Sequence, residues 1–270
     1  MNYLNTFLPP QHSDYLEMWR GITPQVEDEN INLKYEQISQ ILGQYAALNN
    51  QIITVYNMKS QKVLYVSDSY HSISGYNCSI EEYKKKSSFY FLRDLSLAQS
   101  WFIIQTSLWF KTVVQSKIKK FEGKKSIQLY LHNFSISPPE ATKTHQLSLI
   151  VEALEMSKNG SPIIFLIAKK EINSFIKEGG PWWVEFYFNG NERYHYHQED
   201  RKFQKGSILS EREREILLLI KKGFETKAIA EQLELSTHTV DKHRKNMLER
   251  TGAKDTAMLL QICEMGKILN

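Results

Sequence analysis

Apolar residues before position 50 recur at the spacing of an α-helix. Ile38, Ile41, Leu42 and Tyr45 fall on one face of such a helix. The pattern therefore predicts an N-terminal helical segment over residues 1–50.

From residue 51 the hydrophobic period changes to that of β-strands, because runs of β-branched and aromatic residues alternate with turn residues. Short polar helices are expected as far as Lys86, and a longer apolar helix at Leu95–Ser116. Two strands, short helices, a longer helix and three strands form an α+β order, which we expect over residues 51–170. The expected strands, including two that follow residue 170, are Ile52–Tyr56, Val63–Val66, Ser126–Ile136, Leu147–Met156, Pro162–Ala168, Trp182–Phe188 and Glu192–His197.

The last two of these strands flank Asn189-Gly190, a dipeptide that tolerates positive φ at both positions and is typical of a tight hairpin. The polar, aperiodic segment Gln198–Ser207 follows, and we expect it to be an interdomain linker. Residues 171–206 are therefore predicted to be an aromatic β-hairpin followed by a linker.

Residues 207–270 predict a domain of four helices. Ser210 and Glu213 fit a capping box at the start of the first helix, and Gly223 marks its end. Ser236 is placed to cap the third helix, which Gly252 ends. A tight turn between the second and third helices makes a helix-turn-helix motif.

The third helix predicts two faces of different chemistry. Val240 and Met247 lie on the side that anchors the helix to its core, together with Arg244. Lysines on the other side can donate to guanine O6 and N7 or to phosphate, and Asp241 can accept from cytosine N4. Polar residues that project from this opposite side are His238, Asp241, Lys242, Lys245 and Glu249. The candidate DNA-binding residues are Thr237, His238, Thr239, Asp241, Lys242, Arg244 and Lys245.

The block Leu209–Leu217, Gly223, Ile229-Ala230, Leu235-Ser236 and Thr239–Asn246 resembles the LuxR-type (GerE/NarL-like) DNA-binding domain. The resemblance implies a four-helix domain that binds double-stranded DNA, commonly as a dimer through its last helix. It places Thr239 at a phosphate contact and Asp241, Lys242 and Lys245 at base-facing positions, whereas His243 falls on a histidine that is usually structural. Glu225-Thr226 and Asp241 depart from the residues common in that family, which affects the sequence that would be read rather than the fold.

The order of elements over residues 51–170 resembles a PAS domain. Val63–Tyr70, Ile73–Tyr76 and Glu81-Glu82 carry this resemblance, which is weaker than that of the C-terminal block. It implies a five-stranded antiparallel sheet with helices that senses a signal or mediates dimerisation. Cys78 does not lie in a flavin-photoreceptor motif, so no cofactor is predicted. A small-molecule ligand of unknown identity remains open.

Composition narrows the function classes further. The 270 residues are 41% hydrophobic and 24% charged, which is typical of a globular protein, and the net charge of +4 permits a nucleic-acid partner. The apolar runs are too short to span a bilayer, and we expect a cytoplasmic protein without a membrane partner. The two cysteines form no ligand pattern, and the sequence contains no recognisable catalytic signature. His195 and His197 share a strand face, which suits either a solvated or DNA-proximal surface or, with further ligands, a metal.

These features predict a transcriptional regulator that is not an enzyme. Its PAS-like part would sense a signal or dimerise, and its helix-turn-helix would bind DNA as a homodimer. RNA polymerase or a signalling protein is a further expected partner. Two alternatives remain open: a protein-interaction regulator that uses the helix-turn-helix fold without DNA, and a small-molecule sensor whose pocket controls the output.

Overall fold

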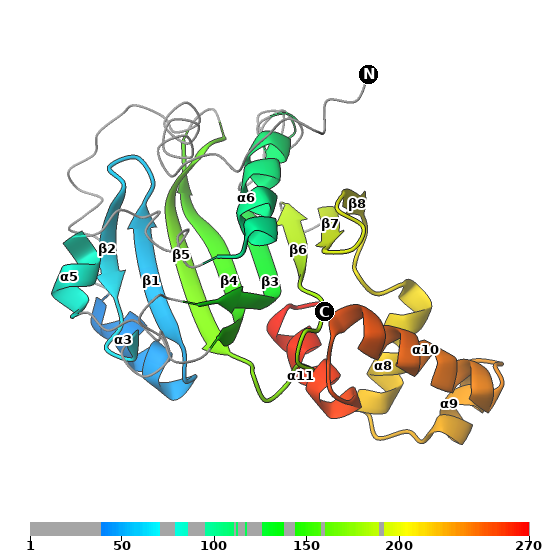
Figure 1. Cartoon of the computed structure of the whole chain (residues 1–270). Coiled ribbons are helices and arrows are strands. Elements are labelled where there is room, and N and C mark those ends of the chain that lie inside the picture. The colour runs from blue at the N-terminus through cyan, green and yellow to red at the C-terminus, as the bar shows by residue number, and fades with distance from the viewer. Residues whose placement is uncertain are drawn as a thin grey trace. The chain divides into compact units, whose positions relative to one another are not determined.

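A computed structural model describes residues 39–70, 79–85, 95–110, 112, 117, 126–137, 144–157, 160–188 and 192–269 (Figure 1). The predicted Asn189-Gly190 turn, Cys78, all of residues 1–38 and the PAS-like motif residues 73–76 lie outside these residues. Among the described residues, no helix is both long and apolar enough to cross a membrane.

The described strands form one antiparallel sheet in the order β2-β1-β5-β4-β3-β6-β7-β8. The seven predicted strands are confirmed, with ends that differ by up to three residues. The prediction of a five-stranded sheet is wrong, because β6, β7 and β8 extend the sheet and β8 forms inside the segment expected as a linker. The strands are β1 Ile52–Asn57, β2 Lys62–Val66, β3 Ile127–Ile136, β4 His145–Met156, β5 Pro162–Glu171, β6 Trp183–Phe188, β7 Glu192–His197 and β8 Phe203–Lys205.

The four helices predicted for the C-terminal region are confirmed, and so is the capping box of the first of them, α8. The N-terminal helix α3 is present, but its predicted apolar face is only partly packed: Leu42 lies against Val55 and Ile164, whereas Ile41 is 66% exposed and Tyr45 55%. Ala46 is the buried residue of this helix, so apolar spacing alone identified only part of its packed side. The helices are α3 Ser39–Leu48, α5 Ile80–Lys85, α6 Leu97–Trp109, α8 Glu211–Lys221, α9 Thr226–Gln232, α10 Thr237–Thr251 and α11 Thr256–Met265.

The chain divides into two compact units, and the division runs through strands β3 and β4. Unit 1 comprises Met1–Gln128, Ser135–His145 and Val151–Lys170, and unit 2 comprises Leu129–Phe134, Gln146–Ile150 and Glu171–Asn270. The second unit therefore contains strands β6, β7 and β8 as well as the C-terminal helices.

In unit 1, β1 pairs with β2 on one side and with β5 on the other. All six residues of β1 are buried, as expected for a strand inside a sheet. Helix α5 packs against β2, and its Tyr83 shares a 2.6 Å hydrogen bond with Tyr56 of β1. Burial raises the pKa of Tyr56 to about 12.

In unit 2, a single hydrophobic core joins strand β6 to the C-terminal helices. Trp183 of β6 belongs to the same buried cluster as Ile216 of α8, Val240 of α10 and Leu259 of α11, and all four are completely buried. The helices therefore share their core with the strand and do not form a separate hydrophobic cluster.

The hairpin of β6 and β7 has two different faces, because side chains alternate along each strand. One face is aromatic: Phe186 makes an edge contact with Phe203, and Phe188 does so with Tyr194. The opposite face carries mostly polar or amphipathic side chains, namely Trp183, Glu185, Tyr187, Arg193, His195 and His197. This second face contacts the helices.

Candidate nucleic-acid interface

Helices α9 and α10 form the helix-turn-helix. Leu235 N–H donates to the Ala230 carbonyl over 2.8 Å, and Glu234 adopts φ 55° in the turn between them. Ala230 and Ile229 are buried where the two helices meet, beside Val240 of α10. A small side chain at Ala230 suits this close approach, as the sequence predicts.

Helix α10 has a capping residue at each end. The Ser236 hydroxyl accepts a 3.0 Å hydrogen bond from Thr239 N–H and thereby caps an otherwise unpaired donor. Gly252 ends the helix with φ 73°, in the left-handed region that favours glycine. These caps fix where α10 begins and ends, and the burial of Val240 and Met247 sets which of its side chains point to solvent.

An exposed row of polar side chains runs along the outer face of α10. Lys242 has no hydrogen bond or ion pair within the described parts of the chain, and Lys245 makes one loose ion pair with Glu249 at 3.7 Å. That pair is 75% and 61% exposed, so it contributes little to stability. Both lysines can therefore reorient toward a ligand at small cost. The exposed row consists of Thr237, His238, Asp241, Lys242 and Lys245.

Two further predicted site residues lie elsewhere on α10. Thr239 is half-buried, and its hydroxyl shares a 2.8 Å hydrogen bond with Ser236. Arg244 is also half-buried, and its guanidinium donates to Thr226 of α9 and Thr256 of α11, each at 3.2 Å. The structure thus brings five of the seven predicted residues into one exposed row and places Arg244 across three helices.

The comparisons with known proteins concern the region that carries this row. Residues 207–263 match the family described as "Bacterial regulatory proteins, luxR family". The C-terminal domain is a LuxR-type helix-turn-helix domain. The match does not extend to residues 1–206.

The curated relatives support the same region. The oxygen regulatory protein NreC of Staphylococcus aureus (strain JH9) is 42% identical over 62 residues, which is 23% of the present chain and 29% of NreC. NreC of strain NCTC 8325 / PS 47 matches with the same values. The chain thus covers less than a third of the length of these relatives, so the likeness concerns the LuxR-type domain alone.

Among solved structures, "VqmA bound to DPO" is 14% identical, with 87% of the present chain and 92% of that chain covered, at a TM-score of 0.29. A Vibrio cholerae VqmA dimer solved without target DNA is 15% identical over the same shares, at a TM-score of 0.30. Likeness at this level carries no weight for the function of the present chain.

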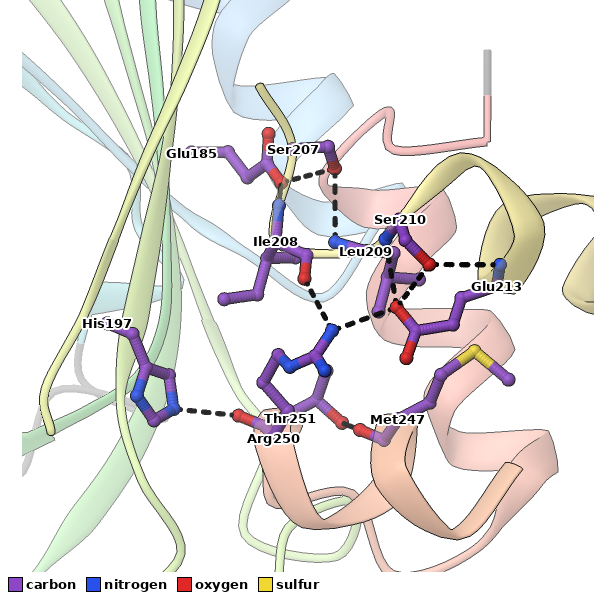
Figure 2. Close-up of polar contacts among 10 residues, drawn as sticks. All are labelled: Glu185, His197, Ser207, Ile208, Leu209, Ser210, Glu213, Met247, Arg250 and Thr251. Atoms are coloured by element: carbon purple, nitrogen blue, oxygen red, sulfur yellow. Dashed lines mark hydrogen bonds and ion pairs between the residues drawn. The ribbon is translucent and has the colours of Figure 1, made fainter. Parts of the chain in front are cut away.

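Strands β6 and β7 bind the C-terminal end of α10 in the LuxR-type domain. Trp183 Nε1 donates to the carbonyl of Thr251 over 3.2 Å. His197 Nε2 lies 2.9 Å from the carbonyl of Arg250 (Figure 2). The last carbonyls of a helix lack intrahelical donors and need partners from elsewhere. The hairpin therefore supplies the hydrogen bonds that complete α10.

A third contact holds the C-terminal end of α11. The Tyr187 hydroxyl donates to the Gly266 carbonyl over 3.1 Å. Burial raises the pKa of Tyr187 above its usual range, which keeps the hydroxyl protonated and able to donate. Trp183 and Tyr187 lie on one face of β6. This single strand therefore binds the C-terminal ends of two helices, α10 and α11.

The start of α8 is joined to the end of α10 by an ion pair. Glu213 accepts hydrogen bonds from Ser210 and from the Arg250 guanidinium, the latter over 2.8 Å (Figure 2). The same guanidinium nitrogen donates to the Ile208 carbonyl over 3.0 Å. The Glu213 carboxylate is almost entirely buried, so it depends on these donors.

The two histidines considered as metal ligands bond backbone carbonyls instead. His195 Nδ1 lies 3.1 Å from the Gly206 carbonyl, and His197 bonds α10 as described above. In the described part of the chain, no group of three or more His, Cys, Asp or Glu residues has the arrangement of a metal site. The alternation of polar residues along the hairpin marks the face of β6 and β7 that contacts the helices. The partners of these residues in the helices were not predicted.

A polar pocket of about 720 Å³ lies beside the C-terminal half of α10. Its lining contains three acidic side chains, Glu199, Asp200 and Glu249, and one basic side chain, Arg250. The lining residues are His195, His197, Glu199, Asp200, Gln204, Ser207, Ile208, Ser210, Asn246, Glu249 and Arg250.

Proposed function

We propose that this protein is a sequence-specific DNA-binding transcriptional regulator that inserts α10 of its LuxR-type domain into a major groove. The observation that carries the proposal is the exposed row on α10, which a capped helix and a shared core hold in place. DNA recognition requires such a row, because bases are read by a few side chains that project from a rigid helix.

Within this proposal, different exposed side chains contact bases and phosphates. Lys242 and Lys245 donate to guanine O6 and N7 or to phosphate, and Asp241 accepts from cytosine N4. Thr237 and His238 lie in the first turn of α10, where contacts to phosphate fix the register. Thr239 is assigned to the same group.

Arg244 was expected to contact DNA as well, and we assign it a positioning role instead. Its hydrogen bonds to α9 and α11 fix the angle at which α10 is presented. A base contact would require both of these bonds to break.

The region of residues 51–170 is proposed to be the PAS-like input module. The order β1-β2-α5-α6-β3-β4-β5 supports this proposal, since it is the order on which the resemblance rests. The module would bind a small molecule or mediate homodimerisation, and a dimer would read two half-sites about one helical turn apart. Native mass spectrometry tests both roles: an unliganded monomer, without a thermal shift across a metabolite panel, would contradict them.

The experiment that tests the DNA-binding proposal is a selection of genomic fragments by the purified protein at low and moderate salt. Lys242→Ala/Lys245→Ala is run in parallel. Its matched control is Lys202→Ala/Lys205→Ala, which removes the same charge at the same spacing near β8. We expect a symmetric motif with the wild type and the control, but not with the α10 variant.

A second candidate function is a protein-interaction regulator. From Lys205 onward the chain has 12 Lys and Arg against 10 Asp and Glu, a low net charge for a DNA-binding domain. Asp241 and Glu249 also stand beside the lysines of α10. A stoichiometric protein partner, together with no DNA enrichment at low salt, would favour this function over the first. RNA polymerase or a signalling protein is the kind of partner expected.

A further inference from the structure

A four-residue segment connects strand β8 to the capping residue of α8 and is held by side chains of the sheet. It comprises Gly206, Ser207, Ile208 and Leu209. Gly206 adopts φ 102°, a conformation that strains any other residue, and its N–H donates to the Arg193 carbonyl over 2.9 Å. The chain therefore turns at Gly206 as it leaves β8, and side chains of the sheet hold the residues that follow.

One cross-strand pair supplies those contacts. Glu185 of β6 and His195 of β7 are direct register partners, so their side chains leave the same face of the hairpin. Glu185 Oε1 accepts hydrogen bonds from Ser207 Oγ and from Ile208 N–H, both at 2.6 Å (Figure 2). His195 Nδ1 bonds the carbonyl of Gly206 over 3.1 Å. The first three residues of the connection are thus bonded to this pair.

Glu185 is placed where a negative charge is costly. It is completely buried, and its Oε2 has no hydrogen-bond partner among the described residues. No ion pair to Glu185 occurs within the described ranges, and an unpaired buried carboxylate favours its protonated form. Burial raises the pKa of Glu185 to about 7, although the bonds from Ser207 and Ile208 act in the opposite direction.

The ionisable groups that surround Glu185 come from several elements. Arg193 of β7 lies over the Tyr187 ring at 4.9 Å, and Arg214 of α8 bonds the Ile268 carbonyl. Both guanidinium groups lower the pKa of Glu185, but less than burial raises it. Burial also raises the pKa of the Cys263 thiol of α11 and that of Tyr187, so both stay neutral near pH 7.

His195 does not supply a compensating charge. Burial lowers its pKa below the usual value, so the imidazole is neutral in the range where Glu185 titrates. To donate to the Gly206 carbonyl, the neutral ring carries its proton on Nδ1.

We propose that Glu185 and His195 form a proton-sensitive clasp that holds the LuxR-type domain on β6 while Glu185 is protonated and loosens when Glu185 ionises. Once the connection is released, the carboxylate reaches water and ionises at its ordinary pKa. The clasp does not depend on DNA and does not rest on the proposed function.

The Ile208 amide is a direct probe of the clasp, since its N–H donates to Glu185. Amide hydrogen exchange of the full chain is measured from pH 6.5 to pH 8.5 and expressed as protection factors, which remove the intrinsic pH dependence of exchange. The pKa of about 7 in the closed state, against 4.5 in the open state, predicts an approximately fourfold loss of protection at Ile208 over this range. The Val240 amide of α10 reports global unfolding and is expected to keep its protection.

Glu185→Gln retains an oxygen that accepts both hydrogen bonds but cannot ionise, so its Ile208 protection should be independent of pH. Glu199→Gln is the matched control on an exposed carboxylate and should behave as the wild type. A wild-type protection factor that does not change with pH would overturn the proposal, and so would a Glu185→Gln profile identical to the wild type.

A second measurement keeps the proposal testable if Glu185→Gln does not fold. Carboxyl ¹³C shifts of the wild-type protein give the titration midpoint of Glu185 directly. A midpoint near 7 supports the clasp, and one below about 5.5 contradicts it. Neither experiment contains DNA, so their failure is distinguishable from a failure of DNA binding.

Discussion

The LuxR-type domain has two sides that use polar groups in opposite ways. On the outer side of α10, Lys242 and Lys245 are exposed and make no strong contact within the described residues. On the side that faces β6, Trp183 and Tyr187 are buried and donate to carbonyls at the ends of α10 and α11. The outer side keeps its hydrogen-bonding capacity for a partner, whereas the inner side has already used it.

This difference separates binding from stability. A substitution on the outer face removes groups that only a partner would engage, so the fold should not change. A substitution on the inner face leaves buried carbonyls or core volume without compensation, which destabilises the unit. The following predictions test this separation, in order of decreasing effect.

The largest effect is expected for Trp183→Ala. The residue is completely buried in the core shared by β6 and the helices, and truncation of such a side chain costs about 3–5 kcal/mol of unfolding free energy. Lys242→Ala, on the outer face, should stay within about 0.5 kcal/mol of the wild type. Denaturant unfolding followed by hydrogen exchange in α10 compares the two, and equal effects would break the comparison.

Gly266→Ala should destabilise by about 1–3 kcal/mol, as expected of overpacking. A Cβ at this position would lie 2.7 Å from His132 Nε2, too close for any undisturbed contact. The double variant Gly266→Ala/His132→Ala removes the clash, so its cost should be smaller than the sum of the two single costs. Additive costs in thermal unfolding would show that this clash does not occur.

His132 should make the protein less stable in acid. Burial lowers its pKa to about 3, so between pH 6.5 and 3 the unfolded chain binds a proton that the native chain does not. Unfolding free energy should therefore fall by up to about 1.4 kcal/mol per pH unit as the pH decreases through this window. Urea titrations at several pH values should show a shallower decrease for His132→Phe, and parallel curves would refute the assignment.

Ser236→Ala should cost about 1 kcal/mol, because the first turn of α10 loses its cap. Thr237→Ala, one residue later and exposed, should stay within about 0.5 kcal/mol. Exchange of the Thr239 amide measures the cap directly. An unchanged protection factor in Ser236→Ala would show that the cap does not stabilise the helix that carries the exposed row.

The helix-turn-helix was predictable because its signals are local. Ser210, Ser236 and Gly252 mark helix ends through contacts within a few residues, and each was located from sequence alone. The exposed row on α10 was predicted from the helical spacing of its polar residues. The hydrogen bonds of Arg244 were not predicted, because its partners Thr226 and Thr256 lie 18 and 12 residues away along the chain.

The sheet was less predictable because strand neighbours are set by long-range pairing. The alternation of apolar and polar residues located β6 and β7. It did not show that the sheet continues into β8 or that these strands support the helices. The burial of Glu185 was not predicted, because its partners Ser207 and Ile208 lie 22 and 23 residues away along the chain. The packed face of α3 was only partly predicted for a related reason, since apolar spacing does not show which side of a helix has a neighbour.

The most direct test of the central claim, that the outer face of α10 binds DNA, is the salt dependence of affinity for a selected genomic fragment. Wild type, Lys242→Ala/Lys245→Ala and the control Lys202→Ala/Lys205→Ala are titrated by fluorescence anisotropy at several salt concentrations. We predict that the α10 variant loses at least about tenfold in affinity and that its salt dependence becomes shallower by about 0.9 for each lysine that contacts phosphate, whereas the control matches the wild type. Unchanged affinity and salt dependence in the α10 variant would contradict the account.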